Sequence, residues 1–121
     1  MDKIALMRRA IALSQQSMSQ NGGPFGAVVS LNGKIIGEGM NRVAATRDPT
    51  AHAEISAIRA ACAEVKSHQL TGCEIYTSCE PCPMCLGAIW WSRISGIYYG
   101  NTQTDAAAIG FDDNAFYREL S

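Results

Sequence analysis

The sequence has little charge, no long apolar run and no cluster of basic residues, and each of these shortages excludes a class of protein. Charged residues make up 17% of the 121 residues, the net charge is −1, and the ten basic residues are scattered from Lys3 to Arg118. Without a stripe of Lys and Arg, nucleic acid is not expected as the main partner. No stretch approaches the roughly 18 apolar residues of a membrane-spanning helix, so no membrane association is expected.

The N-terminus also lacks the apolar core and the small-residue cleavage site of a secretory signal. We therefore expect a cytoplasmic chain. In that compartment its five cysteines would be reduced thiols, metal ligands or redox groups, because structural disulfides are rare there.

Hydrophobic patterning and turn residues predict one domain, over residues 1–121, in which strands and helices alternate. The expected order is a helix over residues 3–20, strands 25–31 and 34–39 joined by Asn32-Gly33, a helix over 51–65, a strand over 73–78, a helix from about 82, a strand over 95–100 and a final helix in "FDDNAFYREL". This order is typical of an α/β fold, a three-layer α/β/α sandwich around a mixed sheet.

Local signals add detail to two of these helices. Asp2 and Thr50 are the predicted N-caps of the first and second helices. In the first helix the expected buried stripe consists of Ile4, Met7, Ile11 and Met18, with Leu6, Ala10 and Leu13 beside it.

The stretch "SCEPCPMC" (residues 78–85) places three cysteines three residues apart. Simple core filling is a poor account of this spacing. A thioredoxin-type redox pair requires a downstream proline, but none of the four prolines follows Cys85. A ferredoxin-type cluster requires a fourth cysteine beyond Cys85, and the sequence has none there.

A zinc site agrees better with the sequence, because a second fragment, "TAHAE", supplies a histidine. His52-Ala53-Glu54 and Pro81-Cys82-Pro83-Met84-Cys85 together form the H-x-E and P-C-x-x-C signature of zinc-dependent nucleobase deaminases. Both fragments open a predicted helix, where the helix dipole favours thiolate. We therefore predict Zn²⁺ bound by His52, Cys82 and Cys85, with the fourth position open to water as in catalytic sites. If Cys79 closed that position, the zinc would be structural.

Glu54 distinguishes these two kinds of zinc site. Residues two apart lie on different sides of a helix, so His52 and Glu54 reach one site only if the helix points its N-terminus at the metal. Two thiolates cancel the charge of Zn²⁺, so a nearby base is needed to activate water. Glu54 is therefore the predicted catalytic proton carrier; the alternative is a solvated acid in the first turn.

With these motifs the chain resembles the cytidine deaminase-like superfamily and, within it, the short bacterial guanine deaminases. The resemblance covers nearly the whole sequence and is carried by "GGPFGAVV", "NRVAATRDPTAHAEISAIRAAC", "YTSCEPCPMCLGAIWWSR" and "TDAAAIGFDDNAFYREL". It implies hydrolysis of guanine to xanthine and ammonia. It also implies that the Asn41 amide hydrogen-bonds to the purine edge, that Phe25 and Trp91 form walls of the pocket, and that the Asp113 carboxylate faces guanine.

The resemblance further implies a homodimer, with strand or segment swapping as one form of pairing. It implies five strands where four are predicted, and the chain ends at Ser121 inside the last predicted helix. We therefore expect a domain truncated at its C-terminus, without the last strand and helix of the superfamily.

Two groups of alternatives stay open at this point. The same chemistry would suit cytosine, a triazine such as ammeline, or adenosine in tRNA. A non-catalytic zinc-binding module would bind zinc without releasing ammonia. For Cys62, Cys73 and His68 we expect only packing or surface placement.

Overall fold

The structure is a computed structural model, and it describes residues 1–101 of the chain. The order of its elements is α1 (Lys3–Ser19), β1 (Gly26–Leu31), β2 (Lys34–Met40), α2 (Val43–Thr46), α3 (Ala53–Val65), β3 (Glu74–Cys79), α4 (Pro83–Ser92) and β4 (Gly96–Asn101). Asp113 and the helix predicted around it lie outside the described residues. In the described part, no helix is both long and apolar enough to cross a membrane.

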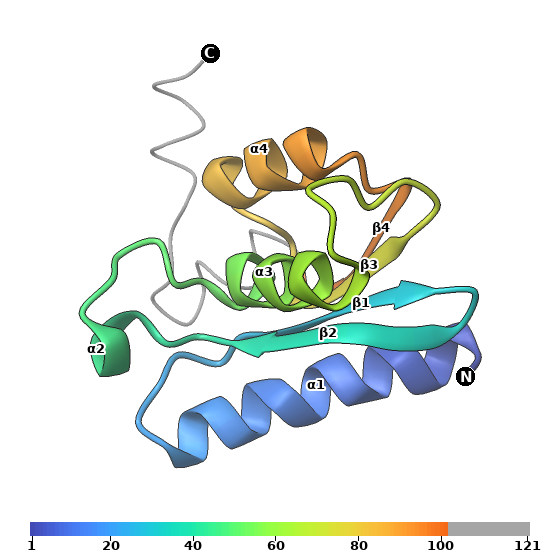
Figure 1. Ribbon diagram of the computed structural model, residues 1–121. Helices are drawn as coiled ribbons and strands as arrows, with labels where there is room; N and C mark the ends of the chain where they lie inside the picture. Colours follow the sequence, from blue (N-terminus) through green and yellow to red (C-terminus); the bar gives the residue numbers. More distant parts are fainter. Residues whose placement is uncertain (102–121) are drawn as a thin grey trace.

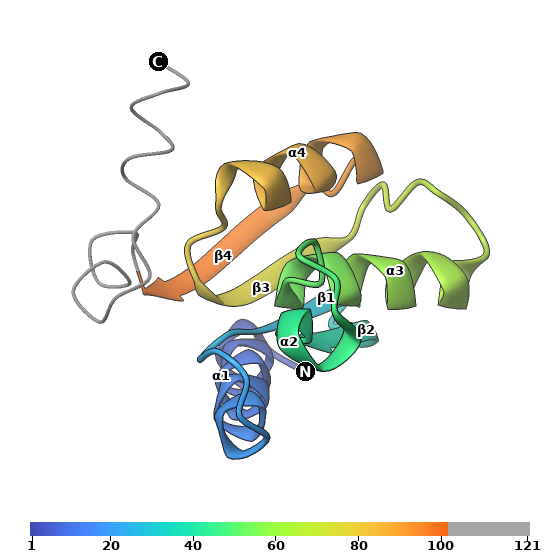
Figure 2. The same cartoon turned by 90° about the vertical axis from the view of Figure 1, so that its left-hand side faces the viewer.

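The four strands form one sheet in the order β2-β1-β3-β4. Strand β1 pairs antiparallel with both β2 and β3, whereas β3 and β4 are parallel. Helix α1 covers one face of this sheet, and α3 and α4 lie side by side on the other (Figure 1; Figure 2). The predicted three-layer sandwich around a mixed sheet is therefore confirmed.

The β1–β2 hairpin turns at the predicted dipeptide. Asn32 and Gly33 have φ values of 52° and 78°, so both adopt the left-handed conformation that a tight two-residue hairpin requires. Successive side chains of β1 point to opposite faces of the sheet, so they belong to two separate core clusters. Val28 packs with α1 in one cluster, while Ala27 and Val29 pack with α3 in the other.

The predicted buried stripe of α1 is wrong for three of its four members, since of the four only Met7 packs against the core. Ile4, Ile11 and Met18 are 65%, 40% and 49% exposed, and the helix instead buries Leu6, Ala10, Leu13 and two serines. Helix α1 lies so close to β1 that a side chain at Gly26 would sit 2.3 Å from the Ala10 carbonyl oxygen. Position 26 must therefore be glycine, and the side of α1 that faces it, which includes Ala10 and Leu13, is the buried side.

Two predictions around α3 also need correction. Thr50 is not the N-cap, because its hydroxyl donates to Asp48 (2.6 Å) and the helix begins two residues later, with His52 at the cap position. No helix or strand was predicted between residues 39 and 51, but Val43–Thr46 forms the single-turn helix α2. Helix α4 begins as predicted, with Cys82 at its cap and Pro83 in its first turn.

Candidate metal centre and active site

The N-termini of α3 and α4 place three side chains together. His52 is the N-cap of α3, Cys82 is the N-cap of α4, and Cys85 lies in the first turn of α4. The Nδ1 atom of His52 is 3.6 Å from the Cys82 sulfur and 3.5 Å from the Cys85 sulfur. The ligand atoms of all three residues lie within 4.8 Å of one another.

These separations fit tetrahedral zinc. Zn–S and Zn–N bonds of about 2.3 and 2.0 Å put neighbouring sulfur and nitrogen ligands about 3.5 Å apart at the tetrahedral angle. Both observed nitrogen–sulfur distances agree with that edge. Among residues 1–101 the group suited to a metal contains His52, Cys82 and Cys85 and does not include Cys79. Three protein ligands leave one tetrahedral position for water or substrate.

The two cysteines of the group differ in their protonation. A hydrogen bond from the Cys85 thiol and, to a smaller extent, the nearby His52 together lower the pKa of Cys82 to about 4. The same contact, together with burial, raises the pKa of Cys85. Because thiolate is the form that binds metal, Cys82 is ready to bind at neutral pH, and the proton of Cys85 leaves when a metal is bound.

Glu54 lies beside this group in the first turn of α3 and is 8% exposed. Burial raises the pKa of Glu54, and the negative charge of Cys82 raises it further. A carboxyl group with a raised pKa is a stronger base than a solvated one, and general acid–base catalysis uses that property.

A cavity of about 470 Å³ opens beside the metal group and Glu54. Phe25 and Asn41 line this cavity, as expected of residues that contact a flat ring. Trp91 does not line it, because its side chain is 72% exposed on α4. The remaining lining residues are Asn21, Gly22, Gly23, Val43, Ala44, Pro49, His52, Ala53, Cys79, Glu80 and Cys82.

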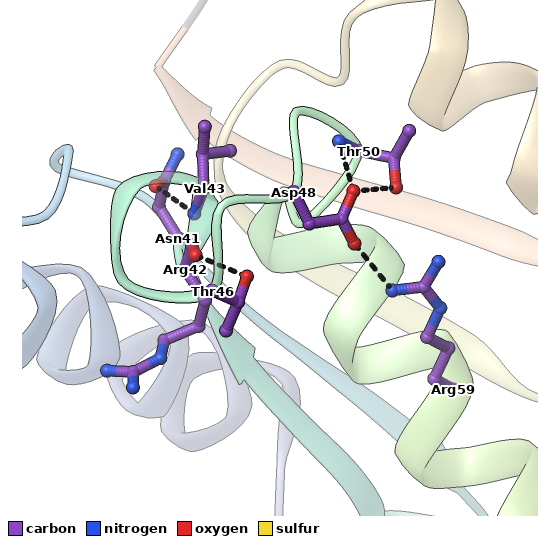
Figure 3. Close-up of polar contacts among 7 residues, drawn as sticks. All are labelled: Asn41, Arg42, Val43, Thr46, Asp48, Thr50 and Arg59. Atoms are coloured by element: carbon purple, nitrogen blue, oxygen red, sulfur yellow. Dashed lines mark hydrogen bonds and ion pairs between the residues drawn. The ribbon is translucent and has the colours of Figure 1, made fainter.

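The orientation of the Asn41 amide is fixed by its own loop. Its Oδ1 atom accepts a hydrogen bond from the Val43 amide (3.2 Å) (Figure 3), and a backbone N–H can only be met by the oxygen end of the amide. The NH₂ end is then the part of the side chain that can donate. In residues 1–101 it has no hydrogen-bond acceptor, so Asn41 can offer a donor to a ligand.

Polar contacts tie the loop that carries Asn41 to α3 (Figure 3). Asp48 accepts hydrogen bonds from the Thr50 amide (2.9 Å) and hydroxyl (2.6 Å), and its second oxygen lies 3.5 Å from Arg59 of α3. The Arg42 amide also donates to the Ala51 carbonyl (2.9 Å). The cavity wall and the helix that carries the metal ligand are thus linked.

Several lining residues could not be identified from the sequence. Cys79 and Glu80 line the cavity from the end of β3, and only their proximity to Cys82 could have suggested this. Asn21 and Pro49 come from loops whose path depends on the tertiary fold. Outside the site, Cys73 is buried and Cys62 half-buried against the core, as expected, and His68 is exposed.

The chain was compared with known proteins. Residues 1–101 match the cytidine and deoxycytidylate deaminase zinc-binding region. Guanine deaminase of Bacillus subtilis (strain 168) is 50% identical over 121 residues, which cover 99% of this chain and 78% of that protein. A tRNA-specific adenosine deaminase of Agrobacterium fabrum is 35% identical over 108 residues, which cover 89% of this chain and 71% of that protein.

Solved structures agree with these sequence matches. The X-ray structure of the Bacillus subtilis guanine deaminase superposes with a TM-score of 0.97 at 49% identity, over 100% of this chain and 78% of that one. The guanine deaminase of Nitrosomonas europaea superposes with a TM-score of 0.87 at 36% identity, over 93% of this chain and 66% of that one. The chain therefore belongs to the zinc-binding cytidine and deoxycytidylate deaminase family.

Proposed function

We propose that the chain is a zinc-dependent guanine deaminase that hydrolyses guanine to xanthine and ammonia. The observation that carries the proposal is a buried carboxyl group, Glu54, beside a metal group of zinc geometry in a cavity that offers an amide donor. The similarity to guanine deaminases of two bacteria supports the choice of substrate. We assign this activity to a single deaminase domain over residues 1–121.

His52, Cys82 and Cys85 would hold the zinc ion. When bound, zinc supplies Lewis acidity, which makes a water molecule nucleophilic near neutral pH. The burial of Cys85 and Glu54 keeps bulk water away from the ligands and strengthens the electrostatic interactions among them.

Glu54 carries the proton in the proposed reaction. Its carboxylate takes a proton from the attacking water as the oxygen bonds to the carbon that bears the amino group. Its carboxylic acid then returns that proton to the neighbouring ring nitrogen. The carboxylate next takes the remaining proton of the added hydroxyl and delivers it to the amine, so that the C=O bond forms as the C–N bond breaks and ammonia leaves. Water adds and ammonia leaves, so the atoms balance. A raised pKa suits a group that must both accept and donate.

Asn41 is proposed to donate to O6 of guanine, since N7 is an acceptor in guanine, adenine and 2,6-diaminopurine alike and only position 6 distinguishes these purines. Because its oxygen accepts from Val43, the NH₂ end of the side chain is oriented to donate toward the ligand. Guanine has acceptors at O6 and N7, whereas position 6 of adenine and of 2,6-diaminopurine carries an amino donor. Phe25 is proposed as a wall for the flat ring, and Asp113 as an acceptor for the N1–H and amino group of guanine.

We further propose that the chain acts as a cytoplasmic homodimer, with segment swapping as one form of pairing. Leu86, Trp90 and Trp91 expose 37%, 68% and 72% of their surface on α4, which is an unusual concentration of large apolar side chains. A partner subunit that covers α4 would also bury Trp91, which does not line the cavity of its own chain. Sedimentation of the wild type and of Trp90→Ser at matched concentrations tests this, because a dimer at both would exclude α4 as the interface.

The test of function is ammonia release by the zinc-loaded protein from a panel of guanine, cytosine, ammeline and a tRNA anticodon stem-loop. Guanine is expected to be the best substrate. Preference for the stem-loop would instead identify a tRNA adenosine deaminase, which the similarity to the Agrobacterium protein makes the second candidate. Bound zinc without ammonia from any substrate would identify a non-catalytic module.

A further inference from the structure

Helix α3 packs against two glycines of strand β2 at unusually short distances. A methyl group in place of the hydrogen of Gly39 would lie 2.2 Å from the Ala53 carbonyl oxygen and 2.6 Å from the Ala57 amide nitrogen. One at Gly37 would lie 2.5 Å from the Ala57 carbonyl oxygen and 2.6 Å from the Ala61 amide nitrogen. Both glycines therefore allow helix backbone to rest directly on strand backbone.

The contact at Gly39 is made with the first turn of α3, which carries residues of the candidate active site. Ala53 is the first residue of α3, between His52 and Glu54. Ordinary van der Waals contacts begin at 3.4 Å, so a side chain at Gly39 would have to push this turn away by about 1 Å. His52 and Glu54 would move with it.

The other metal ligands would not follow that movement. Cys82 and Cys85 belong to α4, which begins just after β3 ends, and α4 stands beside α3 on the same face of the sheet (Figure 1). A displacement of α3 alone would change the distances from His52 to both sulfurs. Metal sites tolerate deviations of only about 0.2 Å in their bond lengths.

We propose that Gly39 is a positioning residue for the metal centre: its missing side chain sets the height of the first turn of α3 above the sheet, and thereby the separation between His52 and the Cys82–Cys85 pair. This inference rests on the proposed zinc site. Gly37 does not share the role, because the backbone atoms above it lie four residues further along α3.

The experiment compares Gly39→Ala with Gly37→Ala, which adds the same methyl group against the same helix. The readouts are zinc affinity by chelator competition, the visible spectrum of the cobalt-substituted protein, and kcat and KM for guanine. Gly39→Ala is expected to bind zinc about 10- to 100-fold more weakly, with an altered cobalt spectrum and a lower kcat. Gly37→Ala is expected to lower the thermal midpoint while keeping the zinc affinity and cobalt spectrum of the wild type.

Equal zinc affinity in Gly39→Ala and the wild type would overturn the inference, as would equal losses in the two variants. A wild-type protein that binds no zinc would defeat the proposed function instead, which keeps the two failures distinct.

If Gly39→Ala does not fold, the same contact can be tested by enlarging a side chain of α3 instead of the glycine of β2. The Cβ atoms of Ser56 and Ala61 lie 2.9 Å from the positions of the methyl groups at Gly39 and Gly37, respectively. Ser56→Thr and Ala61→Ser each add one heavy atom there. Ser56→Thr is expected to weaken zinc binding more than Ala61→Ser does, and equal affinities would contradict the proposal.

Discussion

Within residues 1–101, three long helices cover the sheet, and they begin in two different ways. Helix α1 has an ordinary cap, because the Asp2 side chain accepts a hydrogen bond from the Ala5 amide (2.8 Å). The N-caps of α3 and α4 are His52 and Cys82, and neither side chain caps its helix. The two uncapped ends face the candidate metal centre. Cap stabilisation is therefore absent where the side chain is needed as a ligand.

The largest expected effect comes from replacing the metal-binding N-cap of α3 with a residue that caps the helix by a hydrogen bond. His52→Ser removes a zinc ligand, so zinc content and guanine deamination are expected to fall below detection. Serine is a good N-cap, so in excess chelator the free energy of unfolding should exceed that of the metal-free wild type by about 0.5–1 kcal/mol. Metal analysis and urea denaturation measure both quantities. The exposed His68→Ser is the control, and a metal-free His52→Ser less stable than the metal-free wild type would contradict the comparison.

The next effect separates proton transfer from metal binding. Glu54→Gln keeps the shape of the buried side chain and removes its acid–base function, so kcat for guanine is expected to fall about 10²- to 10⁴-fold while zinc affinity is kept. Steady-state kinetics and chelator competition test this. Glu64→Gln is the control, because Glu64 is exposed near the other end of α3 and does not line the cavity, so this variant should keep most of its turnover. Near wild-type turnover in Glu54→Gln would refute the assigned role.

A smaller effect is expected at the capped end. Asp2→Ala leaves the first amides of α1 without their acceptor, so stability should fall by about 1 kcal/mol. Zinc affinity and kcat should not change, since α1 covers the opposite face of the sheet from α3 and α4. Asp2→Asn keeps an acceptor and serves as the control. The comparison fails if Asp2→Ala alters metal binding as much as it alters stability.

The smallest effect concerns the ion pair on the α1 face. Arg9 donates to Glu38 at 2.6 and 3.0 Å, and this contact lowers the pKa of the Glu38 carboxyl group. A lowered folded-state pKa adds stability above the unfolded pKa, and this stability is lost as the pH falls through the folded value. Because both groups are partly exposed, Glu38→Gln should lower stability by less than about 1 kcal/mol at pH 7.

The pH dependence of that difference is the check. Urea denaturation of the wild type and Glu38→Gln should converge as the pH drops below the ordinary carboxyl range, where Glu38 is protonated in both states. A difference that stays constant down to pH 2 would show that packing, and not charge, distinguishes the two proteins.

The convergence of His52, Cys82 and Cys85 was predicted because the two fragments together match the H-x-E and P-C-x-x-C signature of nucleobase deaminases, although they lie thirty residues apart in the chain. Each ligand stands at or just after the start of a helix, and the helix starts are marked by turn residues and prolines. The hairpin could be predicted from local sequence, because Asn32-Gly33 alone specifies its turn. The hairpin needs no knowledge of distant contacts, whereas only the joint signature linked the two metal-binding fragments.

The failures have the opposite origin. The buried side of α1 depends on how closely the helix approaches Gly26, a residue of a different element, so apolar periodicity selected the wrong side chains. Thr50 was a good cap by residue type, but Asp48 holds its hydroxyl. Cys79 and Glu80 reach the cavity only because β3 ends there.

The metal group joins two segments that lie thirty residues apart in the chain. During synthesis His52 leaves the ribosome well before either cysteine, so the complete binding site arises only after the intervening helix and strand have been made. Once loaded, the ion closes this long loop much as a covalent cross-link would, and it should suppress transient opening of α3. Removal of the ion would then expose the segment between Asn41 and His52 to proteases before the sheet unfolds.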